Sequence, residues 1–373
     1  GQRVTGTELV RIVKDNDQTW LEFPSEADTT GWVPSGLPPL EIIDGQHRLW
    51  AFDDRDELSG NYEIPLVLFD GLDIGWQAYL FWTINVTPKR ISPSLAFDLY
   101  PLLRTQSWVD PDAVEGPTVY REARAQELTE ILWRHPRSPW RGRINMLGER
   151  GAGSVTQAAF IRSLLASYVR RASGQRIVIG GLFGTEMTGH ILLPWTRAQQ
   201  GAFLIMVWDR IRQQVETTSA DWAQRVLSEG KDSMELFTGR QSLLATDQGV
   251  RAVLQTTNDL FFLSGPELGL QRWYGQGSEE IPSDETVTAA LGDFIEHLAD
   301  AYTFMDEVAA GLAFVDWRSS ASASLTADER YRQASFRGSS GYRELRLFAL
   351  RTIVKQASAQ VAAKANLALE LIS

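Results

Sequence analysis

The chain changes character near residue 111, and this change limits the folds that it can adopt. Before it, short apolar runs alternate with turn residues, and we predict residues 40–43 and 64–69 as buried strands. After it, apolar residues recur at helical spacing over long stretches. We therefore expect an α+β chain with two domains: residues 1–110 form a small mixed β-sheet with helices, and residues 111–373 are mainly helical.

Helices are expected in both domains. In the first, residues 46–54 follow an Asp-Gly turn, and residues 75–84 carry aromatic side chains at helical spacing. In the second, a Ser/Ala-rich stretch over residues 319–337 predicts a loop. The helices predicted in the second domain are residues 158–169, 202–215, 250–260, 287–312 and 342–371.

The composition removes several classes of function. The chain has no cysteine, which excludes disulfides, thiol catalysis and cysteine-bound metals and suits a reducing compartment, so a cytoplasmic location is expected. It has no apolar run of about eighteen residues and no signal-like start, so we predict neither a membrane protein nor a secreted one. The net charge of −11 means that any contact with DNA must be local.

Residues 44–48, Asp-Gly-Gln-His-Arg, combine a turn with a helix start, where free backbone N–H groups attract phosphate. Gly45 permits a tight backbone, and the planar cation of Arg48 fits phosphate oxygens. The other three are candidate catalytic residues. His47 can move a proton, Gln46 can orient a water, and Asp44 can steer Arg48 or hold Mg²⁺. An ion pair between Asp44 and Arg48 that merely braces a turn is the alternative.

Residues 42–49, Ile-Ile-Asp-Gly-Gln-His-Arg-Leu, resemble the motif of DGQHR-domain proteins. These include DndB-like proteins of DNA phosphorothioation loci and relatives near deazapurine-modification genes. The family is similar in fold to ParB and sulfiredoxin, whose related motifs bind CTP or ATP phosphates at the same turn. The resemblance implies a ParB/sulfiredoxin-like first domain that binds ATP, GTP or CTP, with Mg²⁺. Sulfiredoxin chemistry itself is excluded, because the chain lacks a thiol.

A second stretch, residues 81–95, resembles the family's Ile-Asn…Lys…Pro-Ser-Leu segment. In ParB, a comparable Asn…Arg…Pro segment faces the triphosphate, so the resemblance implies that Asn85, Thr87, Lys89 and Arg90 bind the nucleotide. A hydroxyl and an ammonium in a loop before a helix could close over phosphates held by residues 44–48. Without the first motif, Lys89 and Arg90 would be interpreted as solvated charges.

The best local candidate for DNA contact lies in residues 133–143, where arginines alternate with aromatic rings. Such a mixture holds phosphates and stacks on bases. The candidate residues are Arg134, Arg137, Trp140, Arg141 and Arg143. The alternative is a corner between helices whose arginines pair with acidic residues, or an interface with a protein partner.

Two functions from different classes follow. The first is a nucleotide-binding protein, with slow hydrolysis of ATP, GTP or CTP as one outcome, in a DNA-modification or anti-phage system whose nucleotide state controls binding to DNA or a partner. The alternative is a non-enzymatic DNA-binding regulator or scaffold of a DNA-modification locus. The expected partners are DNA and other proteins of such a system, without a membrane. A homo-oligomer is left open.

Overall fold

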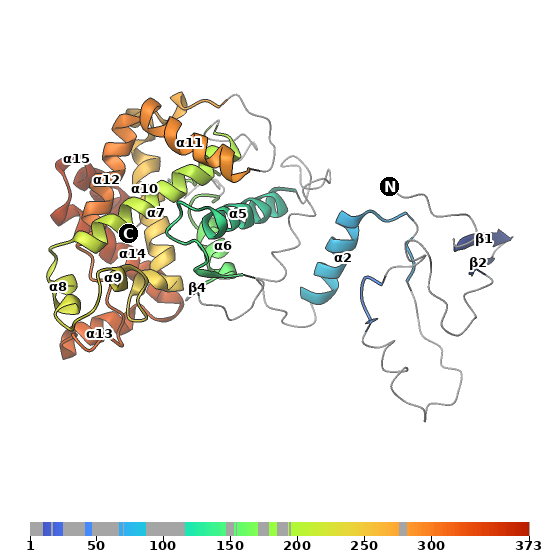
Figure 1. Ribbon diagram of the computed structural model, residues 1–373, viewed down its shortest axis with the longest axis horizontal. Helices are drawn as coiled ribbons and strands as arrows, with labels where there is room; N and C mark the ends of the chain where they lie inside the picture. Colours follow the sequence, from blue (N-terminus) through green and yellow to red (C-terminus); the bar gives the residue numbers. More distant parts are fainter. Residues whose placement is uncertain are drawn as a thin grey trace. The chain divides into compact units, whose positions relative to one another are not determined.

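The computed structural model describes residues 10–15, 18–24, 42–46, 67–69, 71–86, 116–146, 153, 155–170, 179–184, 193, 195–275 and 282–372. The chain divides into two units, Gly1–Thr87 and Pro88–Ser373 (Figure 1). The predicted domain boundary after residue 110 lies outside the described residues. Within these residues the fold is mixed α+β and mostly helical, as expected, and its sheets have two strands each. None of the described helices is long and apolar enough to cross a membrane.

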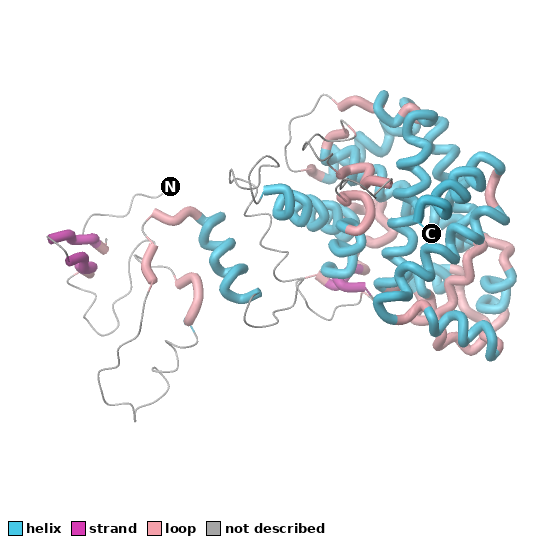
Figure 2. The backbone as a smooth tube through the Cα atoms, turned by 180° about the vertical axis from the view of Figure 1, so that it is seen from behind, coloured by secondary structure: helices cyan, strands magenta, loops and turns pink. Residues whose placement is uncertain are grey.

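The first unit contains a hairpin and one long described helix (Figure 2). Strands β1 (Arg11–Asp15) and β2 (Gln18–Glu22) pair antiparallel, with Arg11 opposite Glu22. Helix α2 (Ile74–Val86) confirms the helix predicted over residues 75–84. The Asp73 carboxylate accepts a hydrogen bond from the backbone N–H of Gly75 at 2.7 Å, which satisfies one of the free donors at the start of α2.

The two buried strands predicted in the first unit are wrong for the residues that can be assessed. Residues 42–46 form a bend and then the first residue of a helix, and residues 67–69 have no strand partner among the described residues. Val67 is 80% exposed. A short apolar run indicates a preference for burial, but it does not specify the strand with which the run would pair.

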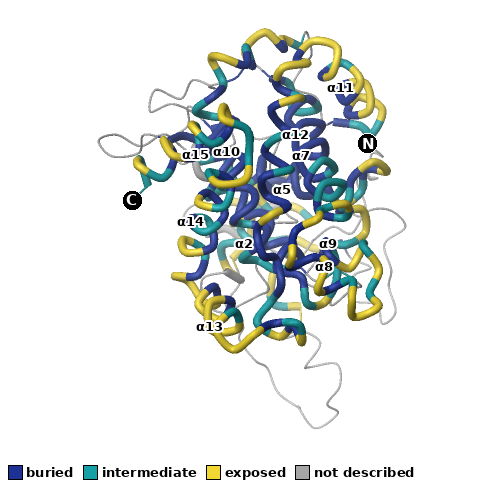
Figure 3. The backbone as a smooth tube through the Cα atoms, turned by 90° about the vertical axis from the view of Figure 1, so that its left-hand side faces the viewer, coloured by how far each residue is buried: buried dark blue, intermediate teal, exposed yellow. Residues whose placement is uncertain are grey.

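The second unit is built mainly from helices, and its two central helices are α7 (Arg197–Thr217) and α10 (Asp247–Leu268) (Figure 1). Helices α11 (Asp284–His297) and α12 (Ala299–Ala313) pack on α7. Helices α6 (Gln157–Leu165), α14 (Gly338–Gln356) and α15 (Ala359–Ile372) pack on α10. Figure 3 shows that the inward faces of these helices are buried. The elements are α5 (Gly116–Arg134), β3 (Ile144–Asn145), β4 (Val155–Thr156), α6 (Gln157–Leu165), α7 (Arg197–Thr217), α8 (Asp221–Leu227), α9 (Met234–Thr238), η3 (Leu243–Ala245), α10 (Asp247–Leu268), η4 (Leu270–Arg272), α11 (Asp284–His297), α12 (Ala299–Ala313), α13 (Ala327–Ser335), α14 (Gly338–Gln356) and α15 (Ala359–Ile372).

The core of the second unit is rich in aromatic rings. Phe203 on α7 meets Phe261 on α10 edge to face, with ring centroids 5.0 Å apart, and lies 5.8 Å from Phe294 on α11. Helix α5 approaches α7 closely, because a β-carbon on Gly201 would lie only 2.9 Å from the side chain of Ile131. Apolar burial together with this close packing supplies most of the stabilisation expected of such a core.

Two of the predicted long helices are each interrupted. The helix expected over residues 287–312 is α11 followed by α12, with a break at Leu298. The one expected over residues 342–371 is α14 followed by α15, with a break at residues 357–358. The predicted loop over residues 319–337 contains α13, which begins with a capping box between Thr326 and Glu329.

Candidate functional site

The described part of the Asp-Gly-Gln-His-Arg segment is residues 44–46. Gly45 has a φ of 96°, a conformation that side chains with a β-carbon rarely adopt, and this fits the tight turn expected there. Gln46 is the first helical residue after the turn, and both Asp44 and Gln46 are exposed. The backbone therefore turns directly into a helical start at this point, as phosphate binding would require.

Most of the remaining residues of the predicted nucleotide site lie outside the described residues. His47, Arg48, Thr87, Lys89 and Arg90 lie outside the described residues, and Asn85 is described only as backbone in the last turn of α2. The convergence of the two stretches on one anion remains a prediction, as does Mg²⁺ at Asp44. Within the described ranges, no group of three or more metal-binding side chains forms a metal site.

Residues 135–143, here called the arginine turn, connect the end of α5 to β3. Consecutive backbone hydrogen bonds hold the segment: Ser138 N–H donates to His135 O at 3.0 Å, Arg141 N–H to Ser138 O at 3.1 Å, and Arg143 N–H to Trp140 O at 2.9 Å. Gly142 lies in the left-handed region, with a φ of 64°, and its N–H donates to the carbonyl of Trp133. The turn is thus a defined structure and not an open loop.

Trp140 anchors the arginine turn in the core. Its side chain is fully buried, and its ring lies 4.9 Å from that of Phe160, 5.1 Å from that of Trp208 and 5.5 Å from that of Phe237. The prediction that Trp140 stacks on nucleic-acid bases does not fit this position, because neither face of its ring is accessible. A buried aromatic side chain of this size instead fixes the turn to the helices around it.

His135 fixes the other end of the turn. Its Nδ1 accepts a hydrogen bond from the backbone N–H of Arg137 at 3.2 Å, so the ring proton lies on Nε2, which is 3.1 Å from Thr288 Oγ1 on α11. Burial lowers the pKa of His135, although the carbonyl and carboxylate of Asp284 act in the opposite direction. The neutral imidazole is therefore a structural part of the turn.

The arginines of the predicted DNA site fall into two groups. Arg134 is engaged inside the protein: its Nε donates to Asp284 Oδ1 at 2.9 Å, and its other nitrogens contact Glu130 and the carbonyl of Pro282. This matches the alternative in which arginines at a helix corner pair with acidic residues. In contrast, the guanidinium groups of Arg137, Arg141 and Arg143 form no hydrogen bond or ion pair with any described residue.

These three arginines line a pocket of about 510 Å³ in the second unit. Its other wall is one face of α7, where Asp209, Arg212 and Glu216 follow one another at helical spacing. This face was not among the predicted sites, although the helical spacing of its charges was a usable signal in the sequence. Its remaining border is formed by Pro136, Ser138, Pro139, Gln213, Met234, Phe237 and Thr238.

The charges on α7 are only partly neutralised by one another. Arg212 donates to Asp209 Oδ1 at 2.7 Å, and the amide of Gln213 donates to the other oxygen of that carboxylate at 2.7 Å. Glu216 lies 3.7 Å from Arg212, and burial raises its pKa even though Arg212 and Arg143 lower it. The Nε of Arg212 is buried without a hydrogen-bond partner among the described residues. Both oxygens of Asp209 thus accept hydrogen bonds, while Arg212 keeps one donor without a partner among the described residues.

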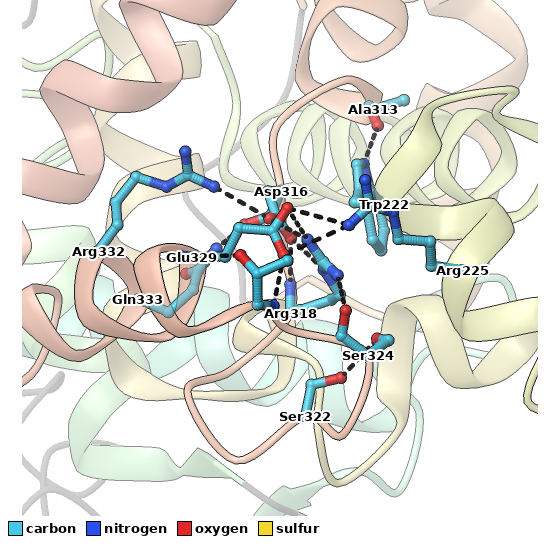
Figure 4. Close-up of polar contacts among 11 residues, drawn as sticks. Trp222, Arg225, Ala313, Asp316, Arg318, Ser322, Ser324, Glu329, Arg332 and Gln333 are labelled. Atoms are coloured by element: carbon cyan, nitrogen blue, oxygen red, sulfur yellow. Dashed lines mark hydrogen bonds and ion pairs between the residues drawn. The ribbon is translucent and has the colours of Figure 1, made fainter.

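A second arginine-rich group gathers around the segment between α12 and α13, with Arg225 from α8 and with Glu329 and Arg332 from α13. It is here called the Asp316 cluster: Arg225, Asp316, Arg318, Glu329 and Arg332 (Figure 4). Arg318 is almost completely buried, and its Nε and Nη2 donate to the two oxygens of Asp316 at 2.9 Å and 2.7 Å. Burial disfavours the charge of Arg318, but the bonds from Asp316 and Glu329 raise its pKa overall.

Each arginine of the Asp316 cluster has a carboxylate partner within the cluster. Arg318 Nη1 also donates to the carbonyl of Ser324 at 2.8 Å (Figure 4). Arg332 donates at 3.3 Å to Asp316 Oδ2, the oxygen that also accepts from Nη2 of Arg318. Gln333 donates to the backbone carbonyl of Asp316 at 3.1 Å. These contacts join α13 to the segment that follows α12. We interpret the cluster as a structural brace, because its arginines already have carboxylate and carbonyl partners.

Comparisons with known proteins add no assignment. A scan against models of protein families, a search of curated proteins and a search of solved structures find no match to the chain. The functional argument therefore depends on the residues and their geometry.

Proposed function

We propose that the chain is a nucleotide-binding protein of a DNA-modification or anti-phage system, and that residues 44–48 hold the triphosphate of ATP, GTP or CTP. The proposal includes membership of the DGQHR-domain group and a ParB/sulfiredoxin-like fold for the first unit. The observation that carries it is the φ of 96° at Gly45, directly before the helical start at Gln46. A positive-φ glycine at a helix start lets backbone N–H groups approach phosphate oxygens.

The proposed roles follow from the side-chain chemistry. Arg48 and Lys89 neutralise the phosphates, and Thr87, Asn85 and Arg90 add donors from the second stretch. Asp44 holds Mg²⁺, while Gln46 and His47 orient a water and move its proton if the nucleotide is hydrolysed. Binding or turnover then changes the affinity of the protein for DNA or a partner.

Isothermal titration of the full chain with ATP, GTP and CTP in the presence of Mg²⁺ tests this proposal. We expect at least one of them to bind and Arg48→Ala to weaken that binding roughly 10- to 100-fold, the usual effect of losing a charged hydrogen bond. Arg11→Ala, an exposed arginine on β1 of the same unit, is the matched control and should change the affinity by less than about twofold. Failure of all three nucleotides to bind would refute the proposal.

A second candidate function is a non-enzymatic DNA-binding regulator. It is favoured by the exposed Arg137 and Arg141, which project from a well-held turn and have no described ion-pair partner. The two functions differ in how DNA affinity responds to salt and nucleotide. A steep salt dependence that nucleotide leaves unchanged supports the regulator, whereas DNA affinity that changes with nucleotide supports the switch.

A further inference from the structure

We propose that the pocket between the arginine turn and α7 binds a phosphate monoester with hydroxyl or amino groups, of the class of a nucleoside monophosphate or the 5′-phosphorylated end of a DNA strand. The site belongs to the second unit only. It does not depend on nucleotide binding at residues 44–48.

Three arginines of the turn line the same pocket. Arg137, Arg141 and Arg143 line one pocket, and none has a described partner for its guanidinium. In most folded proteins, such groups are either scattered on the surface or paired, as they are in the Asp316 cluster. Three planar guanidinium groups that line one pocket and have no ion-pair partner among the described residues match the oxygens of a phosphate.

The backbone of the arginine turn is held by contacts within the protein. Trp140 is packed among three aromatic rings, and the backbone of Arg137 is bonded to the ring of His135. The arginines therefore project from a backbone that is already fixed, and binding need not order it. Such preorganisation reduces the entropic cost of capturing a ligand.

The net charge of the pocket lining matches a phosphate monoester. Four arginines and two carboxylates line the pocket, which leaves two positive charges, the complement of a phosphate monoester near neutral pH. A single strand of phosphodiesters would present one charge per nucleotide along an extended backbone, whereas a monoester carries its charge on one group. The volume of about 510 Å³ also lies within the range of about 300 to 1,000 Å³ that is typical of small-ligand sites.

The carboxylates on α7 set the orientation of the ligand in the pocket. The carboxylates of Asp209 and Glu216 belong to α7, so the phosphate is repelled from that wall and directed to the arginine turn. The carboxylate of Glu216, which accepts no hydrogen bond from the described residues, is an acceptor for a hydroxyl or amino donor on the rest of the ligand. Met234, which is half exposed, gives an apolar surface for a sugar or a base. A nucleoside 5′-phosphate has a phosphate for the arginine turn, hydroxyl or amino groups for α7, and a sugar and base for the apolar surface of Met234.

Titration of the full chain with adenosine 5′-monophosphate and with adenosine tests the site. Both are measured on the wild type and on Arg48→Ala, which weakens any binding at the proposed triphosphate site. We expect the monophosphate to bind and adenosine to bind at least about tenfold more weakly. Arg141→Gln should weaken the monophosphate about tenfold or more. Arg351→Gln, an exposed arginine on α14 without a described ion pair, should stay within about twofold.

A single-stranded hexanucleotide with and without a 5′-phosphate distinguishes the source of the monoester. Preference for the phosphorylated strand identifies a DNA end, and binding of the mononucleotide alone identifies a free metabolite; both support the site. The proposal is overturned if the wild type binds neither monoester, if Arg141→Gln binds as the wild type does, or if the strand binds equally well without its phosphate.

Discussion

Arg318 in the Asp316 cluster is almost fully buried and has both oxygens of Asp316, a carboxylate oxygen of Glu329 and a backbone carbonyl as partners. Arg141 in the arginine turn is exposed and has no described ion-pair partner. The two arginines carry the same charge but differ in whether their N–H groups bond to other residues of the protein. Arg318 has used them internally, so its loss should affect stability. The donors of Arg141 have no partner among the described residues, so its loss should affect binding.

The largest expected effect is that of removing the partner of Arg318. Asp316→Ala would leave a buried guanidinium without its bidentate carboxylate, and we expect the free energy of unfolding to fall by about 3–5 kcal/mol. Urea denaturation measures this change. Arg225→Gln removes only an exposed contact with Glu329 and should cost less than about 1 kcal/mol. A loss below about 1 kcal/mol in Asp316→Ala would mean that Arg318 is not part of a brace.

An intermediate effect concerns pH and the His135 end of the arginine turn. Because burial lowers the pKa of His135 below its ordinary value of 6.5, the unfolded chain takes up the proton first. The contribution of His135 to stability is therefore complete above about pH 6.5 and is lost as the pH falls below it. We expect a smaller loss of stability between pH 7.5 and 5.5 in His135→Gln than in the wild type.

The exposed His297 provides the control for this pH experiment. Its pKa is raised by the carbonyl and carboxylate of Asp293, so its contribution has the opposite sign and is lost as the pH rises. His297→Gln should therefore not reduce the acid sensitivity. Equal acid sensitivity in His135→Gln and the wild type would show that the neutral ring does not hold the turn.

The smallest expected effect is on the stability of variants in the turn itself. Arg137→Gln and Arg141→Gln remove guanidinium groups that form no hydrogen bond or ion pair with a described residue, so each should change the free energy of unfolding by less than about 0.5 kcal/mol. Thermal and urea denaturation of both variants check this. A loss above about 1 kcal/mol would mean that these arginines serve the fold, and the contrast with Arg318 would disappear.

Helical spacing predicted much of the second unit, but burial of polar groups concealed one of its main helices. Helix α5 was not predicted, since its buried face carries Arg124 and Glu127, and these side chains interrupt the apolar pattern. Glu127 lies between Arg124 and Arg197 of α7, and that pairing is invisible before the helices meet. The break at Leu298 was missed because the apolar pattern continues across it.

The candidate site was predictable in its arginines but not in its shape. The sequence indicated Arg137, Arg141 and Arg143, because cations near aromatic residues are typical of phosphate contacts. It could not show that Trp140 points into the core while these arginines do not. The opposite wall on α7 was also missed, since it is more than sixty residues away and only the tertiary fold brings it to the turn.

Gly142 has a consequence for any attempt to transplant this turn. Gly142 lies between Arg141 and Arg143 and has a φ of 64°. A β-carbon there would have no atom within 4 Å, so replacing this glycine would cost only backbone strain, roughly 1–2 kcal/mol. Grafting the arginines onto another helical corner would therefore not reproduce the arrangement unless the glycine and the buried tryptophan are carried with them. The transferable unit is the whole nine-residue turn.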